Sequence, residues 1–247
     1  MEPPVGRPGG CWNSIFHETH LVKGEPGCGL SDRIVIMKFI RCFFLLICLT
    51  ACQTSLVTDL AARPGGRLYY DDFSDPASGW MRTSSPSGKL DYDNGTYQMM
   101  VISPYYDLWA VSGQVFRDVK VEVDVTRLAG PDGNRFGVIC RYRSPQDFYF
   151  FIVASDGYYA IGKVRSGVRT LLDQNMMTYS AAVVTGNGPN HLRFDCTGQT
   201  LSGYVNGQAV AVTEDADFPN GDAGLITGAF DQPGVDVAFD NFVVYKP

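Results

Sequence analysis

The sequence lacks the features that most catalytic and nucleic-acid-binding sites require. After residue 52 the one histidine is His191, so a Ser-His-Asp triad would depend on it, and no Gly-x-Ser-x-Gly turn is present. No His and Cys residues have the spacing of a zinc site, and no glycine-rich phosphate loop leads into Lys and Ser or Thr. A basic stripe is also missing, which argues against nucleic-acid binding.

Glutamate is scarce in the part of the chain that follows residue 52. This part has 22 Asp and Glu (26 minus four) against 15 Lys and Arg (20 minus five), a net charge of −7, and only Glu122 and Glu214 are glutamates. Asp and Gly favour turns, whereas Glu favours helices. Together with 27 Gly, 15 Phe and 13 Tyr in the whole chain, this composition indicates an all-β protein.

No apolar run approaches the roughly 20 residues that a membrane-spanning helix needs. The longest run, 43–49, follows Lys38 and Arg41 and precedes Leu-Thr-Ala-Cys at 49–52, which is the arrangement of a secretory signal. The end of this segment resembles the lipobox of bacterial lipoproteins, which implies acylation of Cys52. We expect a lipid anchor at the outer face of the cytoplasmic membrane or in the cell envelope, because buried acyl chains hold a protein without a spanning helix.

This interpretation divides the chain into four parts. Residues 1–36 are rich in Pro and Gly and precede Met37, a natural initiator, so we interpret them as an upstream extension that results from a start codon assigned too early. Residues 37–52 are the lipoprotein signal peptide, 53–66 a tether, and 67–247 a single domain, which is long enough to bury a substantial core.

The domain reads as short strands separated by turns. Between 119 and 125 every second residue is valine and the residues between are polar, which is typical of a half-buried strand. The stretch 148–155 is apolar on both faces and therefore predicts a central strand, followed by a hairpin at Asp156-Gly157. Further strands are expected at 95–102, 136–143, 158–165, 190–198, 223–230 and 235–246, and another follows the turn at Ser166-Gly167. The segment 201–212 is expected to bend at Asn206-Gly207, and 174–183 is the one stretch that could hold a helical turn. About ten short strands indicate a sandwich or barrel.

Several segments, taken in order, resemble one family of folds. They are YYDDFSDPASGW, DNGTYQM, GNRFGVICRY, FYFFIVASDGYYAIGK, NHLRFDCTGQTLSGYVNGQ, GDAGLITG and FDNFVVY. In this order they resemble the concanavalin A-like lectin/glucanase jelly rolls, especially the laminarinase-type, laminin-G-like and keto-disaccharide-hydrolase-like domains. The resemblance covers about 68–247 and implies two antiparallel sheets packed face to face, with carbohydrate bound on a concave face.

The catalytic motif of the related glucanases is incomplete in this chain. That motif, Glu-x-Asp-x-Glu, corresponds to Glu122, Asp124 and Thr126, and the bulged variant would place Arg127 at the last position. Neither Thr nor Arg donates a proton at neutral pH, whereas a retaining glycosidase needs a protonated second carboxyl. We therefore interpret this stretch as a polar outer face and expect a non-catalytic protein that binds carbohydrate or a cell-surface partner. The alternative is a glycoside-processing hydrolase with an Asp-based site.

A sugar site requires aromatic faces and a few fixed polar groups. We expect a concave site built from Trp109, Arg141, Tyr149, Tyr159 and Lys163. On the strand at 148–155, Tyr149 and Phe151 share one face while Phe148 and Phe150 share the other, and one of these two sets must be core.

The resemblance and the compartment suggest two stabilising features. Laminarinase-type jelly rolls often hold structural Ca²⁺, which implies Asp240 as a ligand, with the Gly95 carbonyl and a carbonyl near Asp71; hard oxygen ligands suit this ion. Cys140 and Cys196, the two cysteines after residue 52, either form a disulfide in an oxidising compartment or remain two separate buried thiols.

Overall fold

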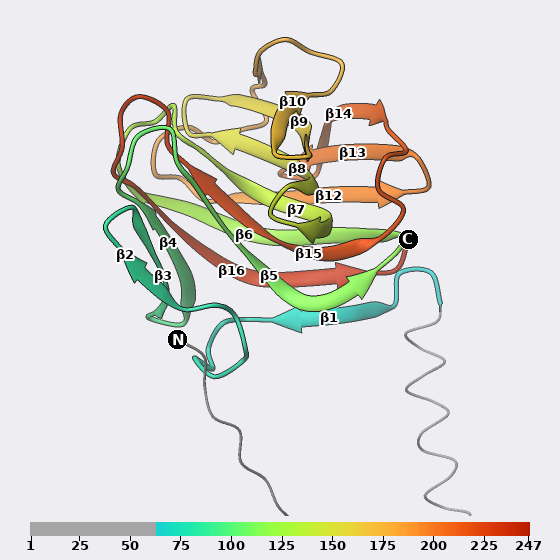
Figure 1. Cartoon of the computed structure of the whole chain (residues 1–247), viewed down its shortest axis with the longest axis horizontal. Helices are drawn as coiled ribbons and strands as arrows, with labels where there is room; N and C mark the ends of the chain where they lie inside the picture. The colour runs from blue at the N-terminus through green and yellow to red at the C-terminus, as the bar shows by residue number, and fades with distance from the viewer. Residues whose placement is uncertain (1–62) are drawn as a thin grey trace, which may run out of the picture. The chain divides into compact units, whose positions relative to one another are not determined.

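The computed structural model describes residues 63–247, which form sixteen strands and no α-helix. The strands make two antiparallel sheets that lie face to face (Figure 1). The prediction of an all-β protein with two antiparallel sheets packed as a sandwich is therefore confirmed. Nothing in the described region is a helix long and apolar enough to cross a membrane. The predicted signal peptide, tether start and Cys52 lie outside the described residues.

The nine-stranded sheet has the order β14-β13-β12-β6-β16-β4-β3-β2, and β1 also pairs with β16. Its strands are β1 (Arg67–Asp71), β2 (Thr83–Ser85), β3 (Gly88–Asp93), β4 (Thr96–Val101), β6 (Val119–Ala129), β12 (Asn190–Thr197), β13 (Thr200–Val205), β14 (Gln208–Glu214) and β16 (Val235–Tyr245).

The seven-stranded sheet has the order β10-β9-β8-β7-β15-β5, and β11 also pairs with β9. Its strands are β5 (Asp107–Phe116), β7 (Arg135–Ser144), β8 (Asp147–Ala154), β9 (Tyr158–Arg165), β10 (Val168–Leu171), β11 (Thr178–Tyr179) and β15 (Gly221–Gly228).

The alternating pattern of β6 sets one side of the core. Its four valines from Val119 to Val125 are buried, and the polar residues between them are partly exposed. Phe194 on β12 and Phe239 on β16 extend the buried face, because alternate residues of neighbouring strands point to the same side of a sheet. The opposite face of β6 carries Glu122 and Asp124, as predicted.

The strand β8 is buried on both faces, which confirms its predicted central position. Tyr149, Phe151 and Val153 point into the core between the sheets. Phe148 and Phe150 point to the outer face of the seven-stranded sheet, meaning the face turned away from the nine-stranded sheet. This outer face is therefore apolar as well, and it forms a second cluster with Ile139, Ile152, Ala160, Val164 and Ile226.

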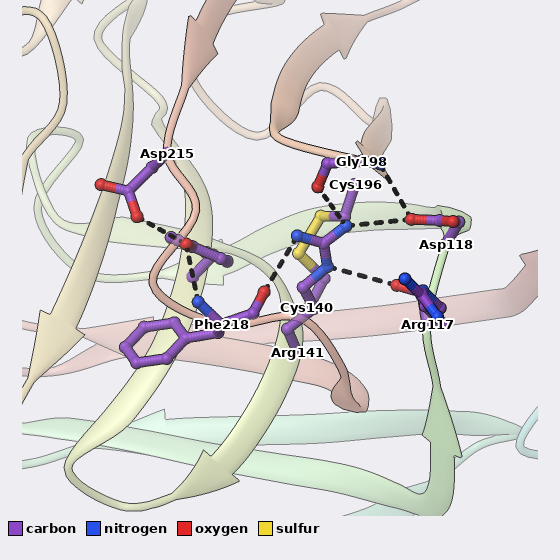
Figure 2. Close-up of a disulfide and its surroundings, with 9 residues drawn as sticks. Arg117, Asp118, Cys140, Arg141, Cys196, Gly198, Asp215 and Phe218 are labelled. Carbon is purple, nitrogen blue, oxygen red and sulfur yellow. Dashed lines mark hydrogen bonds and ion pairs between the residues drawn. A yellow bond between two sulfur atoms is a disulfide. The ribbon is translucent and has the colours of Figure 1, made fainter.

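A disulfide links the two sheets. Cys140 on β7 is bonded to Cys196 on β12, and the Cα atoms are 6.8 Å apart (Figure 2). Both residues are fully buried. Of the two arrangements that the sequence left open for these cysteines, the structure has the bonded one.

Some elements differ from the sequence-based expectation. The strands β2, β3 and β5 were not predicted, and the segment 174–183 contains the two-residue strand β11 and turns instead of a helical turn. All three residues of β2 are exposed, and β5 is mostly half-exposed, so neither strand has a buried face.

Candidate functional site

A cavity of about 500 Å³ opens on the outer face of the seven-stranded sheet. It lies over β8 and β9, where the loop between β10 and β11 folds across the sheet. Its lining residues are Gly133, Arg135, Ile152, Ala154, Asp156, Tyr158, Arg169, Leu171, Asn175, Met176, Met177 and Phe230. Most of this lining is apolar, and cavities of this size and composition are typical of small-ligand sites.

Two arginines share one carboxylate beside this cavity. Arg135 donates from Nη2 and Nε to Asp107 Oδ1, at 2.7 and 3.0 Å. Arg169 forms an ion pair with the other oxygen of the same carboxylate. The side chains of Asp107 and Arg135 are 8% and 5% exposed, whereas that of Arg169 is 39% exposed. Gly228 makes room for the pair, because a Cβ there would overlap the Asp107 carboxylate.

The buried Arg135 is fixed from two sides. Its guanidinium lies over the ring of Phe230, 4.3 Å from the centroid, in a cation–π contact. Burial lowers the pKa of Arg135 to about 10 and also lowers the pKa of Arg169. Arg135 therefore stays charged at neutral pH, and its position is held by Asp107 and Phe230 before any ligand arrives.

Two half-exposed rings flank the apolar part of the cavity. Tyr158 is 41% exposed and Phe230 40% exposed. Tyr158 makes an edge contact with Tyr179 on the neighbouring strand β11, with centroids 5.8 Å apart. A ring held in this way presents a flat face at little entropic cost, which is what stacking against a sugar ring requires.

The five residues predicted to line a concave site do not form one site. Only Trp109 lies on the outer face: it packs on Phe148, with centroids 5.9 Å apart, and its Nε1–H donates to Tyr142 Oη at 3.3 Å. Tyr149 and Tyr159 lie on the side of the sheet that faces the core: Tyr149 is buried in the core, and the partly buried Tyr159 packs against it. The face of β8 that bears Phe148 borders the cavity, so the expected concave face is corrected to this one.

Arg141 has a structural environment (Figure 2). It sits at a bulge in β7 with a φ of 50°, in the left-handed region that costs a non-glycine residue on the order of 1–3 kcal/mol. Its guanidinium donates to the carbonyls of Arg117, Gly198 and Phe218 and to Asp118 Oδ1, at 2.8–3.2 Å. With a residue exposure of 2%, Arg141 ties loops together beside the disulfide and does not face the cavity.

Lys163 is engaged by two carboxylates at the edge of the sandwich. It forms ion pairs with Asp215 and Asp217, and Tyr149 Oη donates to Asp215 Oδ1 at 2.6 Å. Partial burial opposes ionisation of Asp215, but the hydrogen bonds from Lys163 and Tyr149 outweigh it, and the pKa of Asp215 is lowered. Lys163 therefore belongs to a fixed polar network, not to the cavity.

The three residues predicted to surround calcium meet along β16. β1 ends at Asp71, which lies opposite Phe242, and β4, which follows Gly95, pairs with β16 as far as Phe239. Because β6 occupies the opposite edge of β16, the ends of β1 and β4 share one edge. Asp240 lies at the gap between them.

The hydrogen bonds at this gap limit what each residue offers a cation. Asp71 accepts from the Phe73 amide at 2.8 Å and from Trp80 Nε1 at 3.0 Å, so both of its carboxylate oxygens are engaged. Burial, with a contribution from the nearby Asp124, raises the pKa of Asp240. In the region 63–247, no three His, Cys, Asp or Glu side chains are grouped to hold a metal, so a cation here would depend on backbone carbonyls.

Glu122 and Asp124 face away from both the core and the cavity. Asp124 Oδ1 lies 2.7 Å from His191 Nδ1, and its Oδ2 accepts from Asn241 Nδ2 at 3.0 Å. Glu122 lies 3.6 Å from the same imidazole. The predicted polar outer face is thus held by a small hydrogen-bonded group on the nine-stranded sheet.

The residues that line the cavity were missed because they do not form a motif. Asp107 begins β5, Arg135 begins β7, and Arg169 lies on the short edge strand β10. Their side chains meet across the outer face of the sheet, although β5 and β10 lie at opposite ends of its strand order. The sequence signal that was available is the apolar second face of β8, which marks a covered surface outside the main core.

Comparisons with solved structures place the fold. The carbohydrate-binding module CBM66 from Bacillus subtilis superimposes with a TM-score of 0.56 and 18% identity, over 68% of this chain and 96% of that chain. A Bacillus subtilis protein of unknown function with a galectin-like fold gives a TM-score of 0.55 and 12% identity, over 74% of this chain and 97% of that chain. A Bacillus licheniformis beta-glucanase gives a TM-score of 0.52 and 13% identity, over 72% of this chain and 97% of that chain.

The chain matches no protein-family profile and no curated protein sequence. Because these three neighbours are less than 25% identical to the chain, the likeness is one of fold. It confirms the predicted two-sheet antiparallel jelly-roll sandwich.

Proposed function

We propose that this protein is a non-catalytic, lipid-anchored surface protein whose jelly-roll domain binds carbohydrate in the outer-face cavity of the seven-stranded sheet. The observation that carries the proposal is the combination of Tyr158 and Phe230, two half-exposed rings, with guanidinium donors already fixed at the same cavity. Rings that stack on sugar faces and a few oriented polar groups are the requirements of such a site. The neighbours named as a carbohydrate-binding module and a beta-glucanase support this choice of ligand class.

The carboxylates near the cavity favour binding over catalysis. A retaining glycosidase needs two carboxyl groups about 5–5.5 Å apart, one of which gives a proton to the leaving oxygen. Both oxygens of Asp107 are engaged by guanidinium groups, which leaves neither free to carry a proton to a substrate. Asp156 is the one carboxylate among the lining residues of the cavity, and a single acid does not complete a glycosidase pair.

The direct test is a glycan array followed by titration calorimetry on residues 53–247, the whole chain beyond the predicted acylation site. Tyr158→Ala should weaken binding about fivefold or more, since loss of a stacking face removes about 1 kcal/mol or more. The matched control is Tyr70→Ala, because Tyr70 is similarly exposed (42%) but lies on β1 in the other sheet. Equal losses in both variants, or release of reducing sugar from bound glycans, would contradict the proposal.

The anchor is tested separately from the domain. If Cys52 is acylated, the native protein should partition into the detergent phase, incorporate labelled fatty acid, and lack residues 1–51 by mass. Cys52→Ser should abolish both the label and the detergent partitioning, because the thioether requires the thiol. Incorporation that persists in Cys52→Ser, or detection of residues 1–36 in the native protein, would overturn this part of the proposal.

The last part of the proposal is a structural calcium ion at the gap beside Asp240. The raised pKa of Asp240 follows from burial and from Asp124, and a cation held there with the Gly95 carbonyl would offset both effects. Calcium should then raise the melting temperature, a chelator should lower it, and Asp240→Asn should remove the response. Asp231→Asn is the control, because Asp231 is an exposed carboxylate outside this gap. A melting temperature that is insensitive to calcium in the wild type would exclude the site.

A further inference from the structure

The charges beside the outer-face cavity are unequal. Arg135 and Arg169 bring two positive charges to the single negative charge of Asp107. In a partly buried site such an excess is not fully screened by water. The remaining ionisable groups at the cavity are Tyr158 and Asp156. Asp156 is exposed at the rim, where solvent screens its charge.

Arg135 also keeps an unused hydrogen-bond donor. Its Nε and Nη2 atoms bind Asp107, while Nη1 has no hydrogen-bond partner among the described residues. The buried polar side-chain atoms without a partner in this region are Arg127 Nε and Asp236 Oδ1, so Arg135 Nη1 is not sealed inside the protein. Arg135 is itself a lining residue of the cavity, so we take this donor as the group available to a ligand.

Arg169 supplies a second group from the opposite side. Its Nη2 atom pairs with Asp107, and its guanidinium lies 5.9 Å from the centroid of Phe150. At 39% exposure it remains accessible to a ligand. Two guanidinium groups anchored on one carboxylate present planar donors that match the two oxygens of another carboxylate.

We propose that the cavity selects an acidic carbohydrate, with a uronate-type carboxylate of the sugar bound between Arg135 and Arg169 and the sugar ring against the apolar wall. This inference rests on the proposed function and narrows its ligand class. The ligand's carboxylate accepts hydrogen bonds from guanidinium donors that Asp107 does not use. The stacking rings set the plane of the sugar, and the arginines set which edge of it points inward.

The test uses one sugar chain in two charge states. Tri-galacturonate and its fully methyl-esterified form have the same rings and linkages, and only the first carries charge. The wild-type protein should bind tri-galacturonate at least tenfold more tightly than the ester, because a charge-assisted pair is lost. The preference should shrink as salt is raised from 50 mM to 500 mM.

A variant places the effect in the cavity. Arg169→Gln should bring the affinity for tri-galacturonate to within about threefold of that for the ester, while Asp107 keeps its buried partner Arg135. The matched control Arg165→Gln, which removes an exposed ion pair with Asp217 outside the cavity, should leave the preference intact. An unchanged melting temperature establishes that Arg169→Gln is folded.

The outcomes separate the two levels of the proposal. Equal affinity for tri-galacturonate and its ester, or tighter binding of a sulfated galactan oligosaccharide than of tri-galacturonate, overturns the inference and leaves carbohydrate binding standing. A preference that survives in Arg169→Gln also overturns it. Absence of binding to any acidic or neutral glycan defeats the proposed function together with the inference.

Discussion

Removing the disulfide between Cys140 and Cys196 should cost the domain several kcal/mol. The two residues are 56 positions apart, and closing a loop of that length in the unfolded chain corresponds to about 4 kcal/mol at 25 °C in the chain-entropy relation. Both sulfurs are buried, so replacement by alanine adds a small cavity penalty. For a domain of this size, a loss of about 4 kcal/mol lowers the melting temperature by roughly 8–16 °C.

The assay is urea unfolding of the double variant Cys140→Ala/Cys196→Ala under non-reducing conditions. The single variant Cys140→Ala should lose nearly the same free energy of unfolding, because either change removes the bridge. Alkylation of the unfolded wild-type protein without reductant should modify neither cysteine. A double variant within 1 kcal/mol of the wild type, or two alkylated thiols in the wild type, would refute the reasoning.

Two further predictions concern the sandwich itself. Gly137→Ala should destabilise the domain by about 2 kcal/mol or more in urea unfolding, because the new Cβ would overlap a backbone carbonyl of β8. In the control Gly133→Ala the new Cβ would contact only an exposed carboxylate, so the free energy of unfolding should change by no more than about 0.5 kcal/mol. Equal effects of the two changes would disprove this reason. Lys163 and Tyr149 keep the pKa of Asp215 below its ordinary value, so the ionised carboxylate of Asp215 stabilises the folded domain. This contribution is complete above about pH 4 and is lost as the pH falls through the lowered pKa. Lys163→Met should therefore reduce stability at pH 7 by about 1 kcal/mol and flatten the fall of stability below about pH 4; an unchanged acid profile would contradict the assignment.

The parts of the fold that were predictable are those in which a strand has one apolar face. The strand β6 is the clearest case, since its valines alternate with polar residues and the structure buries them in that order. Turn pairs such as Asp156-Gly157 and Asn206-Gly207 also lie between the expected strands. The strand β5 was missed because most of its residues are only half-buried and no apolar face stands out.

The residues of the candidate site were harder to predict than the strands, and β8 shows the reason. Its two faces are equally apolar, so the pattern does not say whether Tyr149 or Phe148 faces the other sheet. The structure shows Tyr149 in the core and Phe148 outward, which separates Trp109 from the other predicted residues. Arg141 illustrates the same limit: a bulge with a left-handed residue redirects its side chain, and nothing in the surrounding residues marks that bulge.

Chemical-shift mapping of the domain with the best-binding glycan from the array would locate the binding face directly. We expect shifts concentrated on the outer face of the seven-stranded sheet, at Ile152, Tyr158, Arg169 and Phe230. Shifts concentrated instead around Asp124 and His191, on the outer face of the nine-stranded sheet, would contradict this expectation.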